Sequence, residues 1–236
     1  MIAIALITAG VFWVVAGFLW VGRRDARSHA SRFQGLVETS PDALEEGMFS
    51  ALVGEASASE PLEDPVDGAS VAYLELRLER LDALGRRASL LVSEETTLLK
   101  VAGVEVALES AQIDVLEEPP ELAEEMPSAL VRALLEDTRH AFPAPDETRP
   151  QRGTKWELRR RRIRLGETLT VIGVAGPGPD GGLRFRSELG PLVVSPRTVS
   201  ELVRDELSAP AAMDRMVAVA GAFGAASLAV ALWLLF

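Results

Sequence analysis

Five arginines lie close together in the third quarter of the sequence, and they are the strongest candidate for a binding surface. The cluster consists of Arg159, Arg160, Arg161, Arg162 and Arg164. On a strand, alternate residues face opposite sides, so Arg160, Arg162 and Arg164 would share one face. Guanidinium groups bind anions, so the cluster could contact anionic lipid headgroups or a protein partner. The alternative is pairing with the chain's own carboxylates, such as the acidic run 117–125. We favour pairing because acidic residues outnumber basic ones by 35 to 24.

Residue types that usually carry catalysis or bind metals are scarce. The chain has no cysteine, which excludes disulfides, thiolate zinc sites, iron–sulfur clusters and cysteine nucleophiles. Its two histidines, His29 and His140, lie in neither a Gly-x-Ser-x-Gly nor a His-Glu-x-x-His motif. We interpret both as solvated side chains, and we predict no catalytic residue, no cofactor and no metal site.

Two other patterns could suggest chemistry but have simpler interpretations. The adjacent carboxylates at 45–46, 94–95 and 124–125 are predicted to lie on solvated faces. The stretch 176–182, GPGPDGG, lacks the Gly-Lys-Ser/Thr of a phosphate-binding loop, and its prolines have no amide hydrogen to donate. We predict a hairpin turn there.

Charge is distributed very unevenly along the 236 residues. Segments 1–22 and 216–236 contain no charged side chain, so all 24 basic and 35 acidic residues lie within 23–215. The net charge of −11 argues against a general nucleic-acid-binding protein. The lipid bilayer is instead the expected partner of the two ends.

The first apolar segment predicts a transmembrane helix. Residues 2–22 would extend about 31 Å as a helix, which matches the hydrocarbon core of a bilayer. Trp20 lies near the end of the segment, and Arg23 and Arg24 follow it, as is typical of membrane anchors. A cleaved signal peptide is the alternative. We favour an uncleaved span because no basic side chain precedes the segment and it is longer than a signal-peptide core.

The last apolar segment, 216–236, predicts a second span. Ser227 is its one hydroxyl-bearing residue, and Arg215 stands directly before it. Gly221, Ala225 and Ala229 recur every four residues, a spacing that lets membrane helices approach closely. We predict that this stripe packs against Gly10 and Gly17 of the first span. Such stripes could also join the helices of two copies of the chain.

Basic residues indicate the orientation of the two spans. Arg23, Arg24, Arg27 and Arg32 follow the first span and Arg215 precedes the second, whereas the opposite side has no basic side chain. The positive-inside rule therefore places the middle region in the cytoplasm. Arginine outnumbers lysine by 22 to 2, which suggests a GC-rich bacterial genome and hence the bacterial inner membrane.

The region between the spans is expected to be rich in strands. Alternation of apolar and polar residues predicts long strands at 49–56, 71–82, 155–165 and 167–175, with short ones at 87–93, 97–101, 104–108, 113–116, 183–186 and 191–194. In 71–82, Leu74, Leu76 and Leu78 would face the core, and Glu75, Arg77 and Glu79 would face solvent. Helices are expected at 128–141 and 198–208. The second would begin with a capping box formed by Thr198 and Glu201 and would turn Leu202 and Leu207 inward. The predicted organisation is a juxtamembrane segment 23–48, a domain 49–208 and a linker 209–215. The predicted class is α+β, with a small, partly open β-barrel or a sandwich.

Four sequence segments of this region occur in a recognisable order. They are VGEA at 53–56, GASVAY at 68–73, LGETLTVIG at 165–173 and PLVVS at 191–195, the last followed by the helical Ser200-Glu201-Leu202. Their order resembles that of the GIDE domain, also called BAM for "beside a membrane". The similarity covers about 49–208. In mitochondrial membrane ubiquitin ligases of the MULAN type, this domain also lies between two membrane helices.

The resemblance implies a membrane-linked function but not the catalytic activity of those ligases. They carry a RING domain that binds zinc through Cys and His, and this sequence offers no such ligand set. We therefore expect a non-catalytic scaffold or interaction module with a protein partner that the residues do not identify. The alternative is a member of the RING-type ubiquitin transferase family that acts only with a separate catalytic chain.

Overall fold

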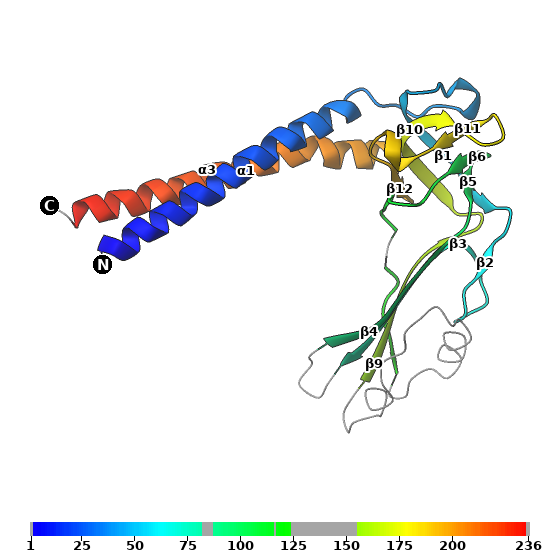
Figure 1. Cartoon of the computed structure of the whole chain (residues 1–236), viewed down its shortest axis with the longest axis horizontal. Coiled ribbons are helices and arrows are strands. Elements are labelled where there is room, and N and C mark those ends of the chain that lie inside the picture. The colour runs from blue at the N-terminus through cyan, green and yellow to red at the C-terminus, as the bar shows by residue number, and fades with distance from the viewer. Residues whose placement is uncertain (1, 82–86, 116, 124–154, 235–236) are drawn as a thin grey trace. The chain divides into compact units, whose positions relative to one another are not determined.

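The computed structural model describes residues 2–81, 87–115, 117–123 and 155–234 (Figure 1). These residues form two compact units: the two ends of the chain, up to residue 37 and from residue 198, and the region 38–197. The boundary differs from the predicted domain 49–208, because the first turns of the last helix belong with the end segments. The predicted helix 128–141 and His140 lie outside the described residues.

The first unit is a hairpin of two long helices. Helix α1 spans Ile2–Phe33 and helix α3 spans Val199–Trp233, and the two ends of the chain lie at the same end of the hairpin (Figure 1). With 32 and 35 residues, the helices extend about 48 and 52 Å. Both are long and apolar enough to cross a membrane.

Helix α3 runs without interruption through 209–215, so the predicted linker there is wrong. Pro210 lies inside the helix. It removes one backbone hydrogen bond, but the alanines on either side of it favour helix, and packing against α1 supports the remaining turns. The predicted start is confirmed: Thr198 and Glu201 form a capping box. Leu202 is buried as expected, whereas Leu207 was expected to face inward and is 44% exposed.

The contact between α1 and α3 follows a seven-residue repeat of small side chains. Ala9 and Ala16 of α1 and Gly224 and Ala231 of α3 are buried. This spacing is typical of helices that wrap around each other with a left-handed twist. Along the same contact, the rings of Phe12 and Phe223 stack with centroids 5.4 Å apart.

The predicted packing of Gly10 and Gly17 against Gly221 is wrong. Gly10 and Gly17 are exposed, and a Cβ placed on any of the three glycines would meet no atom within 4 Å. The reason is the rotation of the helix from one residue to the next. The buried residues Ala9, Ala16 and Ala220 directly precede these three glycines, and one residue turns an α-helix by about 100°, so the glycines point away from the contact.

The second unit is built around a closed five-stranded barrel. Its strands follow the order β1 (Phe49–Ala58), β5 (Leu99–Val101), β6 (Val104–Val106), β11 (Leu183–Phe185) and β10 (Thr168–Pro177). Pairing of β1 with β10 closes the barrel, which is therefore not partly open as predicted. The core includes Leu52, Val106, Val171 and Phe185. A tight turn at Ala102-Gly103 joins β5 to β6.

Shorter elements extend the barrel and surround it. Strand β12 (Val193–Ser195) pairs with β10, and β7 (Gln112–Ile113) pairs with β12. Two 3-10 helices, η1 (Pro41–Ala43) and η2 (Ser187–Leu189), lie in the connections. The α+β, strand-rich class predicted from the sequence is confirmed.

A five-stranded sheet forms the rest of the unit, and we call it the ribbon. It contains β2 (Leu62–Glu63), β3 (Ser70–Leu81), β4 (Arg87–Thr96), β8 (Glu121–Ala123) and β9 (Lys155–Arg164). The long strands β3 and β9 are antiparallel neighbours (Figure 1). On one face, Leu74, Leu76 and Leu78 pack with Trp156 and Leu158 in a second apolar core.

Candidate functional site

The arginine cluster lies on β9, between β3 and β8, and the strand divides it between two faces as predicted. Arg160 stands opposite Leu76 and Arg162 opposite Leu74, on the face that carries the second apolar core. Arg161 stands opposite Glu75, on the other face. The two faces hold separate groups of ion pairs.

On the apolar face, Arg160 and Arg162 meet three carboxylates. Nη1 of Arg162 lies 2.5 Å from Asp64 and 2.6 Å from Asp67, and its Nε donates to Glu118 at 2.8 Å. Arg160 lies 3.3 Å from Glu118 and 3.4 Å from both aspartates. The side chain of Arg162 is 3% exposed and that of Asp64 is fully buried, so these charges depend on each other for compensation.

A short loop before β3 presents the two aspartates. The backbone N–H of Val66 donates to the Asp64 side chain at 2.9 Å, and Gly68 N–H donates to the Asp64 carbonyl at 2.8 Å. Ala69 N–H donates to the Asp67 side chain at 3.1 Å. Asp64 and Asp67 thus each use one side-chain oxygen to fold the loop and turn the other toward the arginines. The sequence Asp-Pro-Val-Asp-Gly was the available signal for such a turn, but it did not reveal the arginine partners.

The ion pairs on the apolar face shift the pKa values of Asp67 and Arg162. The hydrogen bond from Arg162 lowers the pKa of Asp67 below its usual value, although burial opposes this. Burial alone would lower the pKa of Arg162, but hydrogen bonds to Asp67 and Glu118 outweigh it and the pKa is raised. Both shifts favour the ionised pair.

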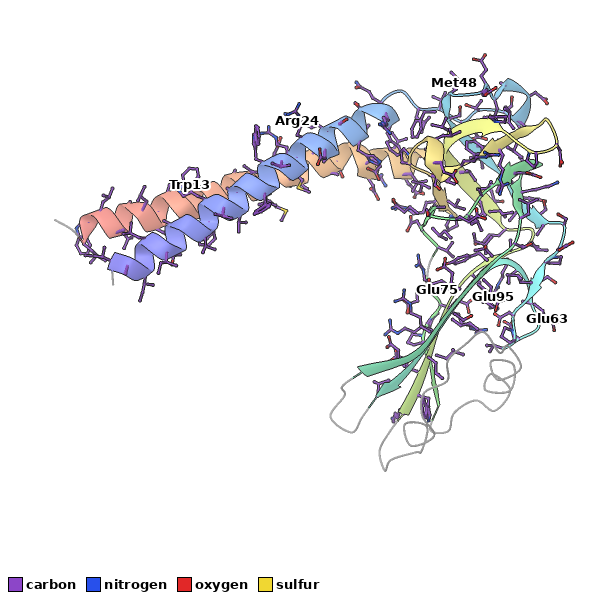
Figure 2. The ribbon with its side chains drawn as sticks, viewed as in Figure 1. Trp13, Arg24, Met48, Glu63, Glu75 and Glu95 are labelled. Carbon is purple, nitrogen blue, oxygen red and sulfur yellow. The ribbon has the colours of Figure 1, made fainter. Side chains whose placement is uncertain are left out.

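On the opposite face, Glu75 is the centre of a second group. Arg77 Nε donates to it at 2.6 Å, Arg161 Nη1 at 3.1 Å and the Tyr73 hydroxyl at 3.3 Å. Glu75, which lies on the ribbon (Figure 2), was predicted to face solvent but is only 5% exposed. The prediction failed because the neighbouring strand covers this face with its own long side chains. Burial, followed by the nearby charge of Glu75, raises the pKa of Tyr73 well above its usual value.

Arg159 completes this second face. It lies 2.5 Å from Glu157 and 2.8 Å from Glu117, with Glu79 at 3.7 Å. Arg161 also donates to the backbone carbonyl of Ile113. The predicted pairing with the acidic run 117–125 is therefore observed for its first two residues, whereas Glu124 and Glu125 lie outside the described residues.

Carboxylates compensate the whole cluster, so internal pairing accounts for it. Arg164, which lies 3.0 Å from Glu118, has a side chain that is 57% exposed, whereas those of Arg160 and Arg162 are almost completely buried. Lipid or partner contact by these arginines stays a prediction. A cleft of about 540 Å³ lies beside Arg164 and is lined by both polar and apolar residues, among them Glu118, Glu167 and Leu165.

The remaining candidates are distributed over both units. His29 lies on α1 with its Nδ1 3.3 Å from Glu206 of α3, a contact the sequence did not reveal. The carboxylate pairs at 45–46 and 94–95 are exposed, as predicted. In 176–182, Gly178 N–H donates to the Gly182 carbonyl at 2.7 Å, which confirms the hairpin turn. Across the described residues, no three His, Asp or Glu side chains are placed to hold a metal ion.

The residues predicted as membrane anchors lie on the hairpin. Trp20 is 57% exposed, and Arg24 and Arg215 are exposed as well. Arg23 and Arg27 instead reach across to Asp214 of α3, Arg27 at 3.2 Å.

Comparison of the chain with protein-family models, with curated proteins and with solved structures finds no match in any of the three. The resemblance to the GIDE domain therefore rests on the sequence segments. In the fold, three of these segments come together: 53–56 lies on β1, 165–173 leads into and along β10, and 191–195 includes β12. These three strands are hydrogen-bonded neighbours.

Proposed function

We propose that this chain is an integral membrane protein whose two helices span the bilayer and tether a GIDE/BAM-like domain at its surface. The domain acts as a non-catalytic scaffold that recruits a protein partner. By the positive-inside rule it lies on the cytoplasmic side of a bacterial inner membrane.

The observation that carries this proposal is the exposure of the apolar helices. Only 12% of the apolar window of α1 and 17% of that of α3 is buried. Large apolar side chains, among them Ile7, Phe18 and Phe223, are more than half exposed. A core helix of a soluble protein would bury such side chains, whereas a bilayer accommodates them at no cost.

The scaffold role is supported by how the domain uses its charges. Its arginine cluster is paired with the domain's own carboxylates, as expected of residues with a structural role. Three of the four GIDE-like segments also lie on the hydrogen-bonded strands β1, β10 and β12, which supports the resemblance.

Alkaline carbonate extraction of membranes that contain the full chain tests the anchoring. We expect the protein to remain in the membrane pellet. Changing the exposed Val14 and Leu228 to Asp should release it, because each charge near the middle of a span costs about 2.5–3.5 kcal/mol. The matched control places Asp at Ser31 and Ser208, which are exposed on the polar part of the same helices, and should stay in the pellet. Release of the unmodified chain would overturn the proposal.

Two further measurements test topology and role. Alkaline phosphatase fused after Phe236 should be active and a fluorescent protein fused there should be dark, and the reverse result would refute the cytoplasmic placement. Photo-crosslinking from the domain surface in native membranes should trap one partner reproducibly. Transfer of ubiquitin by the purified chain alone would contradict a non-catalytic role.

A further inference from the structure

The polar and apolar parts of α1 and α3 change over at the same level of the hairpin. Beyond Gly22 every turn of α1 carries charge, and a Cβ on Gly22 would lie 3.8 Å from Met213 of α3. One residue later, Arg23 pairs with Asp214. Four arginines surround this level, and we call them the collar: Arg23, Arg24, Arg27 and Arg215.

The four arginines of the collar differ in what compensates them. Asp214 contacts both Arg23 and Arg27 and partly neutralises them. Arg24 and Arg215 are exposed, and among the described residues neither has a carboxylate partner. Arg24 projects from α1 in Figure 2. Counting Asp25 and Asp214 against the four arginines leaves the collar at +2, in a chain whose net charge is −11.

We propose that the collar, through Arg24 and Arg215, binds the headgroups of anionic phospholipids. The inference rests on the proposed membrane insertion, which places both residues within about 3 Å of the end of the apolar segments along the helix axis. The headgroup layer is about 5–7 Å thick on each side, so both guanidinium groups reach the phosphates. Arginine suits this ligand because its planar donors match phosphate oxygens.

Electron spin resonance on the full chain, reconstituted in phosphatidylcholine bilayers, tests the proposal. Trace spin-labelled phosphatidylglycerol or phosphatidylcholine reports how strongly each lipid associates with the protein. One arginine near the surface favours an anionic lipid by roughly fivefold. Averaged over all lipids around the hairpin, we expect a preference of about twofold or more for phosphatidylglycerol, weakened by salt.

Matched variants locate the site. Changing Arg24 and Arg215 together to Gln should bring the ratio close to one. Changing Arg32 and Arg204 to Gln removes the same charge, one arginine from each helix, at exposed positions about 12 and 17 Å farther along the hairpin. This control should keep the preference.

The remaining outcomes would overturn the proposal in distinguishable ways. Equal association of the two lipids with the unmodified chain, or equal losses in both double variants, would refute a site at the collar but leave the membrane anchoring intact. Absence of a motionally restricted component for either lipid would show that the chain is not inserted, and would overturn the proposed function as well.

Discussion

Strand β9 and the collar both concentrate arginine, yet they use it in opposite ways. On β9, Arg160 and Arg162 are buried against Asp64, Asp67 and Glu118. At the collar, Asp214 pairs with Arg23 and Arg27, whereas Arg24 and Arg215 are exposed to solvent. The difference shows that the supply of carboxylates within reach, rather than the density of arginine, decides whether such a cluster is structural or available for binding.

Different interactions hold the two regions together. The ribbon contains buried ion pairs, which cannot lose one member without leaving a buried charge. The hairpin is held by close packing of small residues, and its ion pairs are partly exposed and worth little. Mutations should therefore rank differently in the two regions.

The largest effect is expected from Arg162→Met. The change leaves the fully buried Asp64 with only the more distant Arg160, so the free energy of unfolding should fall by about 3 kcal/mol or more. Urea unfolding of the full chain in detergent, followed by the fluorescence of the buried Trp156 with the other tryptophans changed to Phe, measures it. Arg164→Met is the control: it removes an exposed arginine from the same Glu118 and should cost no more than about 1 kcal/mol. Equal losses of unfolding free energy in the two variants would contradict the difference between buried and exposed ion pairs.

In the hairpin, packing should matter more than charge. A Cβ on Gly224 would lie 3.2 Å from Nε1 of Trp13 and 3.4 Å from Cβ of Phe12, so Gly224→Leu should destabilise the hairpin by about 1–3 kcal/mol. Because the chain has no cysteine, dyes on cysteines introduced at Ser31 and Ser208 report helix separation during SDS titration. Gly221→Leu, on a face with no atom within 4 Å, should leave the midpoint unchanged. A shift for Gly221→Leu as large as that for Gly224→Leu would contradict the observed contact.

A smaller effect on stability, but an informative one, is expected from Asp214→Asn. The pairs it removes are partly exposed, so the stability of the hairpin should change by no more than about 1 kcal/mol. Preference for phosphatidylglycerol should rise, because Arg23 and Arg27 lose their counter-charge. An unchanged lipid preference would mean that Asp214 does not control the charge of the collar.

The smallest effect is expected from the ionisation of Tyr73, which should appear only at alkaline pH. Tyr73 is the one tyrosine of the chain, and its pKa is raised by burial and by Glu75. A raised pKa contributes stability that is complete below the usual pKa of about 10 and is lost as the pH rises above it. Absorbance at 295 nm near pH 11 should therefore show no tyrosinate until urea unfolds the domain. Glu75→Gln should bring ionisation to lower pH, and full ionisation in the folded chain at pH 11 would contradict the burial.

Alternation of residue types predicted much of the domain. Leu74, Leu76 and Leu78 defined the face of β3 correctly, and the split of the arginines across β9 followed from the same rule. The burial of Glu75 did not follow, because it depends on which strand lies beside β3. Residues 75 and 161 are far apart in sequence, and no local pattern reveals their pairing.

For the helices, too, the sequence predicted some features and missed others. The apolar segments and the capping box at Thr198 were evident from local composition. The continuity of α3 through Pro210 was not, because tertiary packing overrides the local cost of proline. The contact surface was also missed: a four-residue stripe at Gly221 was visible in the sequence, whereas the observed seven-residue repeat needed the partner helix to define it.

The pairing of β1 with β10 delays closure of the barrel during synthesis on the ribosome. Phe49 pairs with Val174, so the barrel cannot close until nearly three quarters of the chain has been made. At roughly 5–20 residues per second, β1 waits about 6–25 s for its neighbour. During that interval α1 is already available to the insertion machinery. On the proposed membrane topology, α1 can therefore insert while the sheet that will close the barrel still has unpaired edges.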